Sequence, residues 1–156
     1  MSVKSQFLKK LQSRHPTSAA SNNKSQIDIA TFRWGMELLQ AQMDTWLMET
    51  GLNAQTLTAS MMDLLVEGGA FEIPAIVLHY EDRVIKFMPI FLYGQGVMGC
   101  VEATLHTGKS VIALGRLFMR AGHVSDWTFT PPGSLSHTGD VFDEETFYHL
   151  IAGLLP

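Results

Sequence analysis

The chain has 156 residues, of which 46% are hydrophobic and 17% are charged, and its formal net charge is −4. This length fits a single globular domain, and the large apolar fraction excludes a chain that is disordered throughout. The one cysteine, Cys100, excludes an internal disulfide and a multi-cysteine zinc site, and it favours a reducing, cytoplasmic location. The longest uncharged run, residues 87–101, is too short for a transmembrane helix.

The start of the chain differs in charge from the rest. Residues 1–24 contain five basic residues and no acidic one, whereas the remainder contains six basic and fifteen acidic residues. Apolar residues in this arm recur at helical spacing, at Val3, Phe7, Leu8 and Leu11. We predict a basic, partly flexible arm over residues 1–24 and a single domain over residues 25–156. The arm could contact a protein or a membrane surface, serve as a cleaved targeting segment, or be a frayed terminus.

A long helix is predicted over residues 26–50, with Gly51 as its C-terminal stop. Its apolar residues recur at steps of three and four: Phe32, Met36, Leu39, Met43 and Trp46 or Leu47. A second helix is predicted from Asn53 to Gly68–Gly69. Its apolar set is Leu57, Met61, Leu64 and Leu65. Together the two segments predict an N-terminal helical hairpin.

Beyond Gly69 the apolar residues alternate, which predicts strands. The predicted strands are residues 71–80, 83–93, the segment after Gly96, 110–120 and 124–130. A loop over 131–139 and a helix over 144–154 complete the chain. The fold class is therefore α+β, with the helical hairpin, an antiparallel sheet of about five strands and a C-terminal helix packed on the sheet.

The segment from Gly94 to Gly99 contains the pattern G-x-G-x-x-G, which in dinucleotide-binding proteins is followed by a helix. The residues that follow it here alternate instead, with Val101, Ala103 and Leu105 on one side. This alternation favours a strand. Nucleotide binding through Gly94–Gly99 is thus the least favoured function. The glycines are better explained by a turn at Gly94–Gly96 and by either a bulge in the sheet or close packing at Gly99.

An acidic cluster lies at residues 137–145 and includes His137 and Asp140. These residue types could form a metal site, because carboxylates and a histidine can share a metal. Helix initiation explains the pattern better, with Asp143 as N-cap and Glu144 and Glu145 in the first turn, where the helix dipole favours acids. Neither a metal site nor a cofactor is predicted.

Catalytic arrangements based on histidine or cysteine find little support in the sequence. His123 and Asp126 could form a polarised pair, and Cys100 could form a thiol dyad with His79 or His106. A dyad would also need positive charge, which Lys109 or Arg116 would have to supply. No nucleophile motif surrounds these residues, so no catalytic residue is predicted.

The most distinctive stretch is GHVSDWTFTPPG, residues 122–133. Trp127 and Phe129 share one side of a predicted strand and precede a stiff Pro-Pro pair, so they could line the rim of a binding surface or be buried in the core. The residues predicted for binding are Trp127, Phe129, His123, Asp126, Arg116 and His79.

We therefore predict a non-catalytic protein-binding module, such as a small cytosolic adaptor, inhibitor or chaperone-type protein that forms a homodimer. Its partner would be another protein, and the acidic balance argues against nucleic acid. The alternative is a small-molecule-binding protein or small enzyme that uses His, Cys and Asp residues in a pocket between the helices and the sheet.

Overall fold

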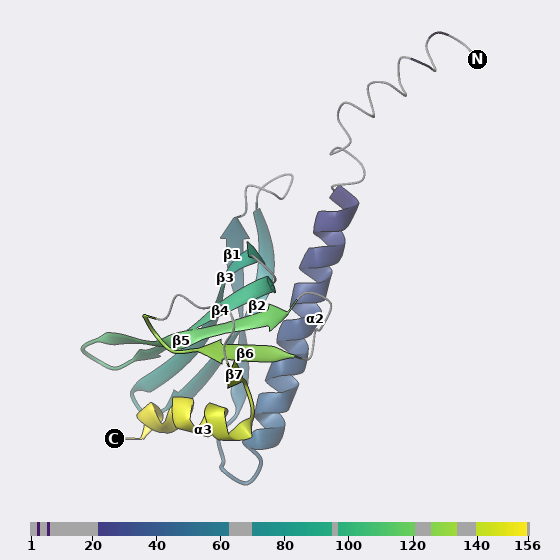
Figure 1. The fold of residues 1–156 in the computed structure, drawn as a ribbon. Helices are drawn as coiled ribbons and strands as arrows, with labels where there is room; N and C mark the ends of the chain where they lie inside the picture. The colour runs from purple at the N-terminus through teal and green to yellow at the C-terminus, as the bar shows by residue number, and fades with distance from the viewer. Residues whose placement is uncertain are drawn as a thin grey trace.

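The computed structural model describes residues 22–62, 70–94, 97–120, 126–133 and 140–155, together with Val3 and Gln6. A long helix, α2 (Asn22–Trp46), precedes the strands, and a short helix, α3 (Glu144–Ile151), follows them and continues into a 3-10 turn, Ala152–Leu154 (Figure 1). The strands are β1 (Ala54–Met62), β2 (Ala70–Tyr80), β3 (Arg83–Gly94), β4 (Val97–His106), β5 (Val111–Arg120), β6 (Trp127–Thr130) and β7 (Asp140–Val141).

Within the described residues, the strands form one seven-stranded antiparallel sheet whose spatial order follows the chain order. The α+β class and the antiparallel sheet are confirmed. The expected number of about five strands is too low. The sequence prediction omitted β1, assigned to a helix, and β7, whose two residues are too few to give a periodic signal.

The predicted helical hairpin is wrong, because the segment after α2 is strand β1. It pairs with β2 along its whole length, from Ala54 opposite Leu78 to Met62 opposite Ala70. The spacing of Leu57 and Met61 indicated a helix, but Leu57 is exposed, and the buried residues Ala59 and Met61 alternate as in a strand. Leu64 and Leu65 lie outside the described residues.

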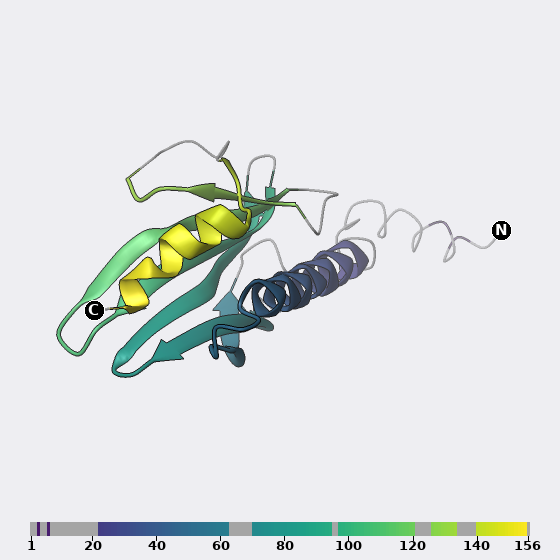
Figure 2. The same ribbon diagram turned by 90° about the horizontal axis from the view of Figure 1, so that it is seen from below.

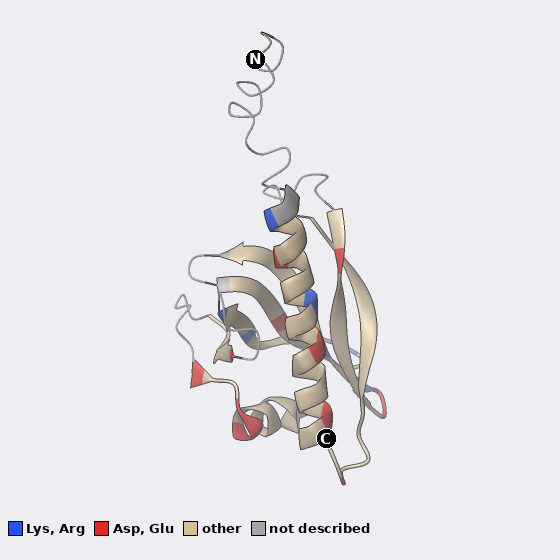
Figure 3. Ribbon diagram, turned by 90° about the vertical axis from the view of Figure 1, so that its right-hand side faces the viewer, with Lys and Arg blue, Asp and Glu red and all other residues tan. Residues whose placement is uncertain are grey.

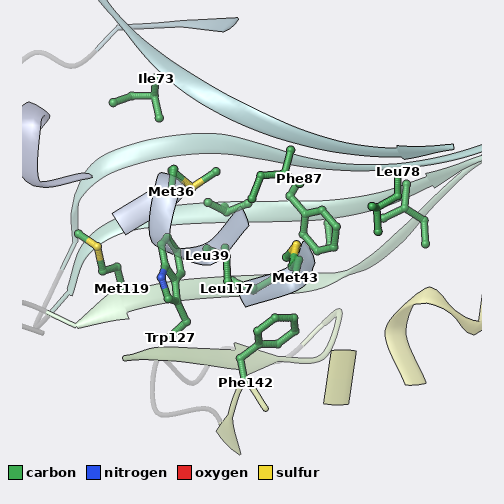
Figure 4. Close-up of a cluster of buried hydrophobic side chains, with 14 of the residues drawn as sticks. Met36, Leu39, Met43, Ile73, Leu78, Phe87, Leu117, Met119, Trp127 and Phe142 are labelled. Carbon is green, nitrogen blue, oxygen red and sulfur yellow. The ribbon is translucent and has the colours of Figure 1, made fainter. Parts of the chain in front are cut away.

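Helix α2 buries one stripe of side chains against the sheet, as its spacing predicts. The stripe comprises Ile29, Phe32, Met36, Leu39 and Met43, and Leu47 in the turn after the helix continues it. Each of these residues is at most 2% exposed. Figure 4 shows Met36, Leu39 and Met43 among side chains of the sheet, including Phe87, Leu117 and Trp127. Tyr93 on β3 also donates a hydrogen bond to Asp28 at 2.6 Å, which ties the first half of α2 to the sheet.

Gly99 identifies the face of the sheet that α2 covers. Its φ is +111°, and a Cβ added there would lie 2.7 Å from a ring carbon of Phe32. Side chains alternate along a strand, so Val101 shares the face of Gly99 and Cys100 points to the opposite, outer face. Cys100 and Phe118 form a small buried cluster there, with Phe91 packed against it.

Helix α3 lies over the sheet near the end of α2 (Figure 2). The predicted N-cap is confirmed, because the backbone N–H of Thr146 donates to the Asp143 carboxylate at 2.9 Å. Phe142 and Phe147 form the hydrophobic staple, with ring centroids 6.2 Å apart. Arg83 on β3 donates to the carbonyl of Gly153 at 2.8 Å, which fixes the C-terminal end of the chain on the sheet. Neither described helix is long and apolar enough to cross a membrane.

Candidate binding cleft

A cleft of about 460 Å³ lies where α2, the end of β5, β6 and the start of α3 meet. It is lined by Gln42, Trp46, Arg120, Asp126, Trp127, Thr128, Val141, Phe142, Asp143 and Glu144. The aromatic residues form its apolar part, since the rings of Trp46 and Phe142 are 5.9 Å apart in an edge-on arrangement. The cleft therefore offers an apolar surface with polar groups around it, the composition expected of a binding site.

Trp127 is 3% exposed and packs near Phe32, with ring centroids 6.4 Å apart. Its indole Nε1 is buried without a hydrogen-bond partner among the described residues, and the same holds for the Thr128 hydroxyl. Buried donors usually have acceptors, so an unpaired indole N–H beside a cleft is a notable exception. The sequence left open whether Trp127 belongs to the core or to a binding surface. In the fold it belongs to the core and also lines the cleft.

The charged groups that line the cleft are mainly acidic. Asp126, Asp143 and Glu144 contribute three carboxylates, and Arg120 is the one basic residue among the described lining. The hydrogen bond from the backbone N–H of Thr146 lowers the pKa of Asp143 below its ordinary value of 3.8. This carboxylate is therefore ionised at neutral pH, and the cleft favours a basic ligand.

A smaller hollow of about 210 Å³ adjoins the cleft along α2. It is lined by Leu38, Leu39, Gln42 and Trp127, and it shares Gln42 and Trp127 with the cleft. Leu38 and Gln42 lie one helical turn apart on α2. The two depressions thus follow the side of α2 that faces β6.

The residues predicted for binding do not form one site. Trp127 and Asp126 line the cleft, and Phe129 lies behind it, with its ring 6.3 Å from that of Phe142. Arg116 projects from the outer face, where it lies 3.5 Å from a Glu102 carboxylate oxygen. His79 is exposed near the β2–β3 turn, where it pairs with Val84. His123 lies outside the described residues.

Cys100 does not form a thiol dyad with either His79 or His106. Cys100 is buried, and burial raises the pKa of its thiol to about 12. His106 lies six residues further along β4, about 20 Å away at the rise of a strand. His79 lies near the same end of the sheet as His106, because Val84 pairs with both. A protonated thiol so far from either imidazole lacks the two features of a cysteine nucleophile.

The glycine pattern and the acidic cluster are explained by local structure. Gly94 ends β3 and Gly99 lies in β4, so a strand occupies the place where a dinucleotide site needs a helix. Asp143 caps α3, and Glu144 and Glu145 fall in its first turn. Within the part of the chain that the structure describes, no three His, Cys, Asp or Glu side chains lie close enough together to hold a metal ion.

The sequence analysis missed the contribution of α2 to the cleft. Gln42 and Trp46 come from a helix that was expected to bury one stripe, and Arg120 comes from the end of β5. The sequence does mark another apolar side of α2, because Ile27, Trp34 and Ala41 are spaced seven residues apart, but Gln42 and Trp46 do not belong to that set. Seven residues are nearly two helical turns, so these side chains share one side of the helix.

Comparisons of the chain with protein-family models, with curated proteins and with solved structures give no match.

Proposed function

We propose that this protein is a non-catalytic protein-binding module whose cleft receives a basic, partly apolar segment of another polypeptide. The observation that carries the proposal is the lining of the cleft, in which aromatic rings are surrounded by the carboxylates of Asp126, Asp143 and Glu144. Aromatic side chains supply contact area, and carboxylates select a basic partner.

The basic arm of the chain itself has the chemistry that this cleft selects. Lys4, Lys9, Lys10 and Arg14 accompany the apolar residues Phe7, Leu8 and Leu11. The cleft begins at Gln42, which is 20 residues and about 30 Å along α2 from Asn22. The eight steps from Arg14 to Asn22 span at most about 28 Å when fully extended. An arm from a second copy therefore fits the cleft at lower cost than the arm of the same molecule.

The test is a fluorescence anisotropy titration of the full-length protein against a labelled peptide of residues 1–14. We expect saturable binding that weakens as salt is added, because ionic contacts are screened. Glu144→Lys should weaken binding about five- to tenfold. The matched control is Glu145→Lys, which makes the same charge change in the same helical turn but at a residue that does not line the cleft. A scrambled peptide of the same composition checks the apolar spacing.

Equal effects of the two substitutions, or equal binding of the scrambled peptide, would show that only nonspecific charge attraction is measured. Absence of peptide binding to protein that is dilute enough to be monomeric would refute the proposed partner chemistry.

A small-molecule ligand is the second candidate, and the size of the cleft favours it. A volume of about 460 Å³ falls within the range of roughly 300–1,000 Å³ usual for ligand pockets. A compound that raises the thermal midpoint of the protein, and loses this effect when Trp127→Phe removes the indole N–H, would favour this function over peptide binding.

A further inference from the structure

Helix α2 has a second apolar stripe on the side that faces away from the sheet. We call this the outward stripe, and it comprises Ile27, Trp34, Leu38 and Ala41 on α2 and Met48 in the turn that follows. Ile27, Trp34 and Met48 are 64%, 55% and 69% exposed. Figure 3 looks onto this side of α2, where no other described helix or strand lies in front of most of the helix. A row of exposed apolar residues along a helix typically marks an interaction surface.

We propose that the outward stripe pairs with the same stripe of a second copy of the chain, with the two α2 helices antiparallel. This inference rests on the proposed function in taking the protein to bind proteins, and it names a second copy as the partner. An antiparallel pair related by a two-fold axis near residues 37 and 38 places Ile27 opposite Met48 of the second copy. It also places Trp34, the largest side chain of the stripe, opposite Ala41, the smallest. Such self-complementarity is what a two-fold interface requires.

The sizes of the paired side chains support this register. Ala41 has the smallest side chain of the outward stripe. An indole of the second copy that projects over Ala41 therefore meets less steric obstruction than it would over Leu38 or Met48. Trp is also among the residues most enriched at the centres of protein interfaces.

The charges of α2 favour the antiparallel arrangement over the parallel one. The first half of the helix carries Lys24 and Arg33, and its one acid, Asp28, is held by Tyr93. From Glu37 onward the charged residues are acidic, at Glu37 and Asp44 in the helix and at Glu49 beyond it. Antiparallel helices set the basic half of one copy beside the acidic half of the other, and they oppose the two helix dipoles.

The same arrangement would bring the arm of one copy to the cleft of the other. In this register Asn22 of the second copy lies beside the C-terminal end of α2, about 10–17 Å along the helix axis from Gln42 and Trp46. That distance is well within the reach of the segment between Arg14 and Asn22. One dimer would then contain two equivalent arm-to-cleft contacts.

The first test measures the mass of the full-length protein by sedimentation velocity over a range of concentrations. We expect a reversible dimer for the natural sequence and a weakening of the dimer by about thirtyfold or more for Trp34→Glu. Leu155→Glu is the matched control, because Leu155 is similarly exposed (59%) but lies at the other end of the chain. It should leave the dimer intact. A natural protein that stays monomeric at high concentration, or equal effects of the two substitutions, would overturn the proposal.

A cysteine experiment tests the direction of pairing. Glu37→Cys places a thiol near the two-fold axis, so mild oxidation should link two copies through a disulfide. Ile27→Cys should not link to itself, because residue 27 of each copy lies about 30 Å from the other in the antiparallel register. The natural Cys100 does not interfere, since it is buried and protonated. Crosslinking of Ile27→Cys but not Glu37→Cys would indicate parallel helices and refute the register.

The tests of the dimer and of the cleft fail independently. If Trp34→Glu abolishes the dimer but leaves peptide binding unchanged, both proposals are supported, and the outward stripe and the cleft are separate binding surfaces. Peptide binding is therefore also measured on the monomeric Trp34→Glu protein, whose cleft holds no arm of a second copy. A dimer of the natural protein together with no peptide binding by Trp34→Glu would refute the cleft function and leave the outward stripe as the interface.

Discussion

The two described helices make different demands on their surroundings. Helix α3 has one buried set, Phe147, Leu150 and Ile151, and its N-cap and first-turn acids are complete within the chain. Helix α2 has a buried stripe against the sheet and an apolar stripe on the opposite side, with no acid in its first turn and no base in its last. The apolar side of α3 and its N-cap find their contacts within the chain. Helix α2, in contrast, has apolar side chains on two sides, and only one of these sides is covered.

The largest effect should come from the buried stripe of α2. Phe32 is fully buried between Gly99 and Trp127, so Phe32→Ala leaves a cavity that the sheet cannot close. We expect a loss of about 3–5 kcal/mol in the free energy of unfolding. Urea denaturation of the natural protein and of Phe32→Ala, both at the same protein concentration, measures this difference. A loss below about 1 kcal/mol would mean that this side of α2 is not held against the sheet.

A smaller effect is expected at Gly99, where β4 meets α2. An alanine there would place its Cβ 2.7 Å from the Phe32 ring at a φ of +111°. Gly99→Ala should cost about 1–3 kcal/mol in the free energy of unfolding. The clash depends on the ring, so the cost should fall when Phe32→Leu is also present, and a double-mutant cycle measures the coupling. Strict additivity of the two substitutions would contradict the contact.

The N-terminus of α3 should respond to pH. The lowered pKa of Asp143 means that its ionised form stabilises the fold, so this contribution is complete above about pH 4 and is lost as the pH falls through the lowered value. Thermal midpoints of the natural protein and of Asp143→Asn, which remains a good cap, should therefore differ at pH 7 and converge as the pH falls below 4. A difference that stays constant down to pH 2 would exclude ionisation of Asp143 as its cause.

The smallest effect on the fold itself is expected at the outward stripe. Trp34 is more than half exposed, so Trp34→Ala should change the unfolding free energy of the dilute monomer by less than about 0.5 kcal/mol. This loss should be far smaller than that of Phe32→Ala, which removes a side chain from the other side of the same helix. If the stripe pairs two copies, the thermal midpoint of the natural protein rises with concentration, whereas that of Trp34→Ala does not. A large loss in the dilute monomer would show that Trp34 packs within its own chain.

The sequence predicted well wherever a local pattern has one structural solution. The strand pattern of β4 followed from the alternation of Val101, Ala103 and Leu105, and the start of α3 followed from Asp143 and the acids after it. The same kind of pattern failed at residues 54–62, because Leu57 and Met61 satisfy a helical spacing while the register with β2 makes this segment a strand. Pairing with a neighbouring strand overrides local helical spacing when the same residues suit both structures.

Some residues of the candidate cleft could be identified from the sequence, whereas others join it only through the packing of separate elements. Local patterns in the sequence identify the unusual segment that contains Trp127 and Asp126, the contrast between the basic arm and the acidic remainder, and the long helix α2. The packing of the elements adds Gln42 and Trp46 to the cleft, separates Arg116 and His79 from it, and leaves one apolar stripe of α2 buried and the other exposed. Periodicity records which residues share a side of an element, whereas the packing of distant elements selects the side that is covered.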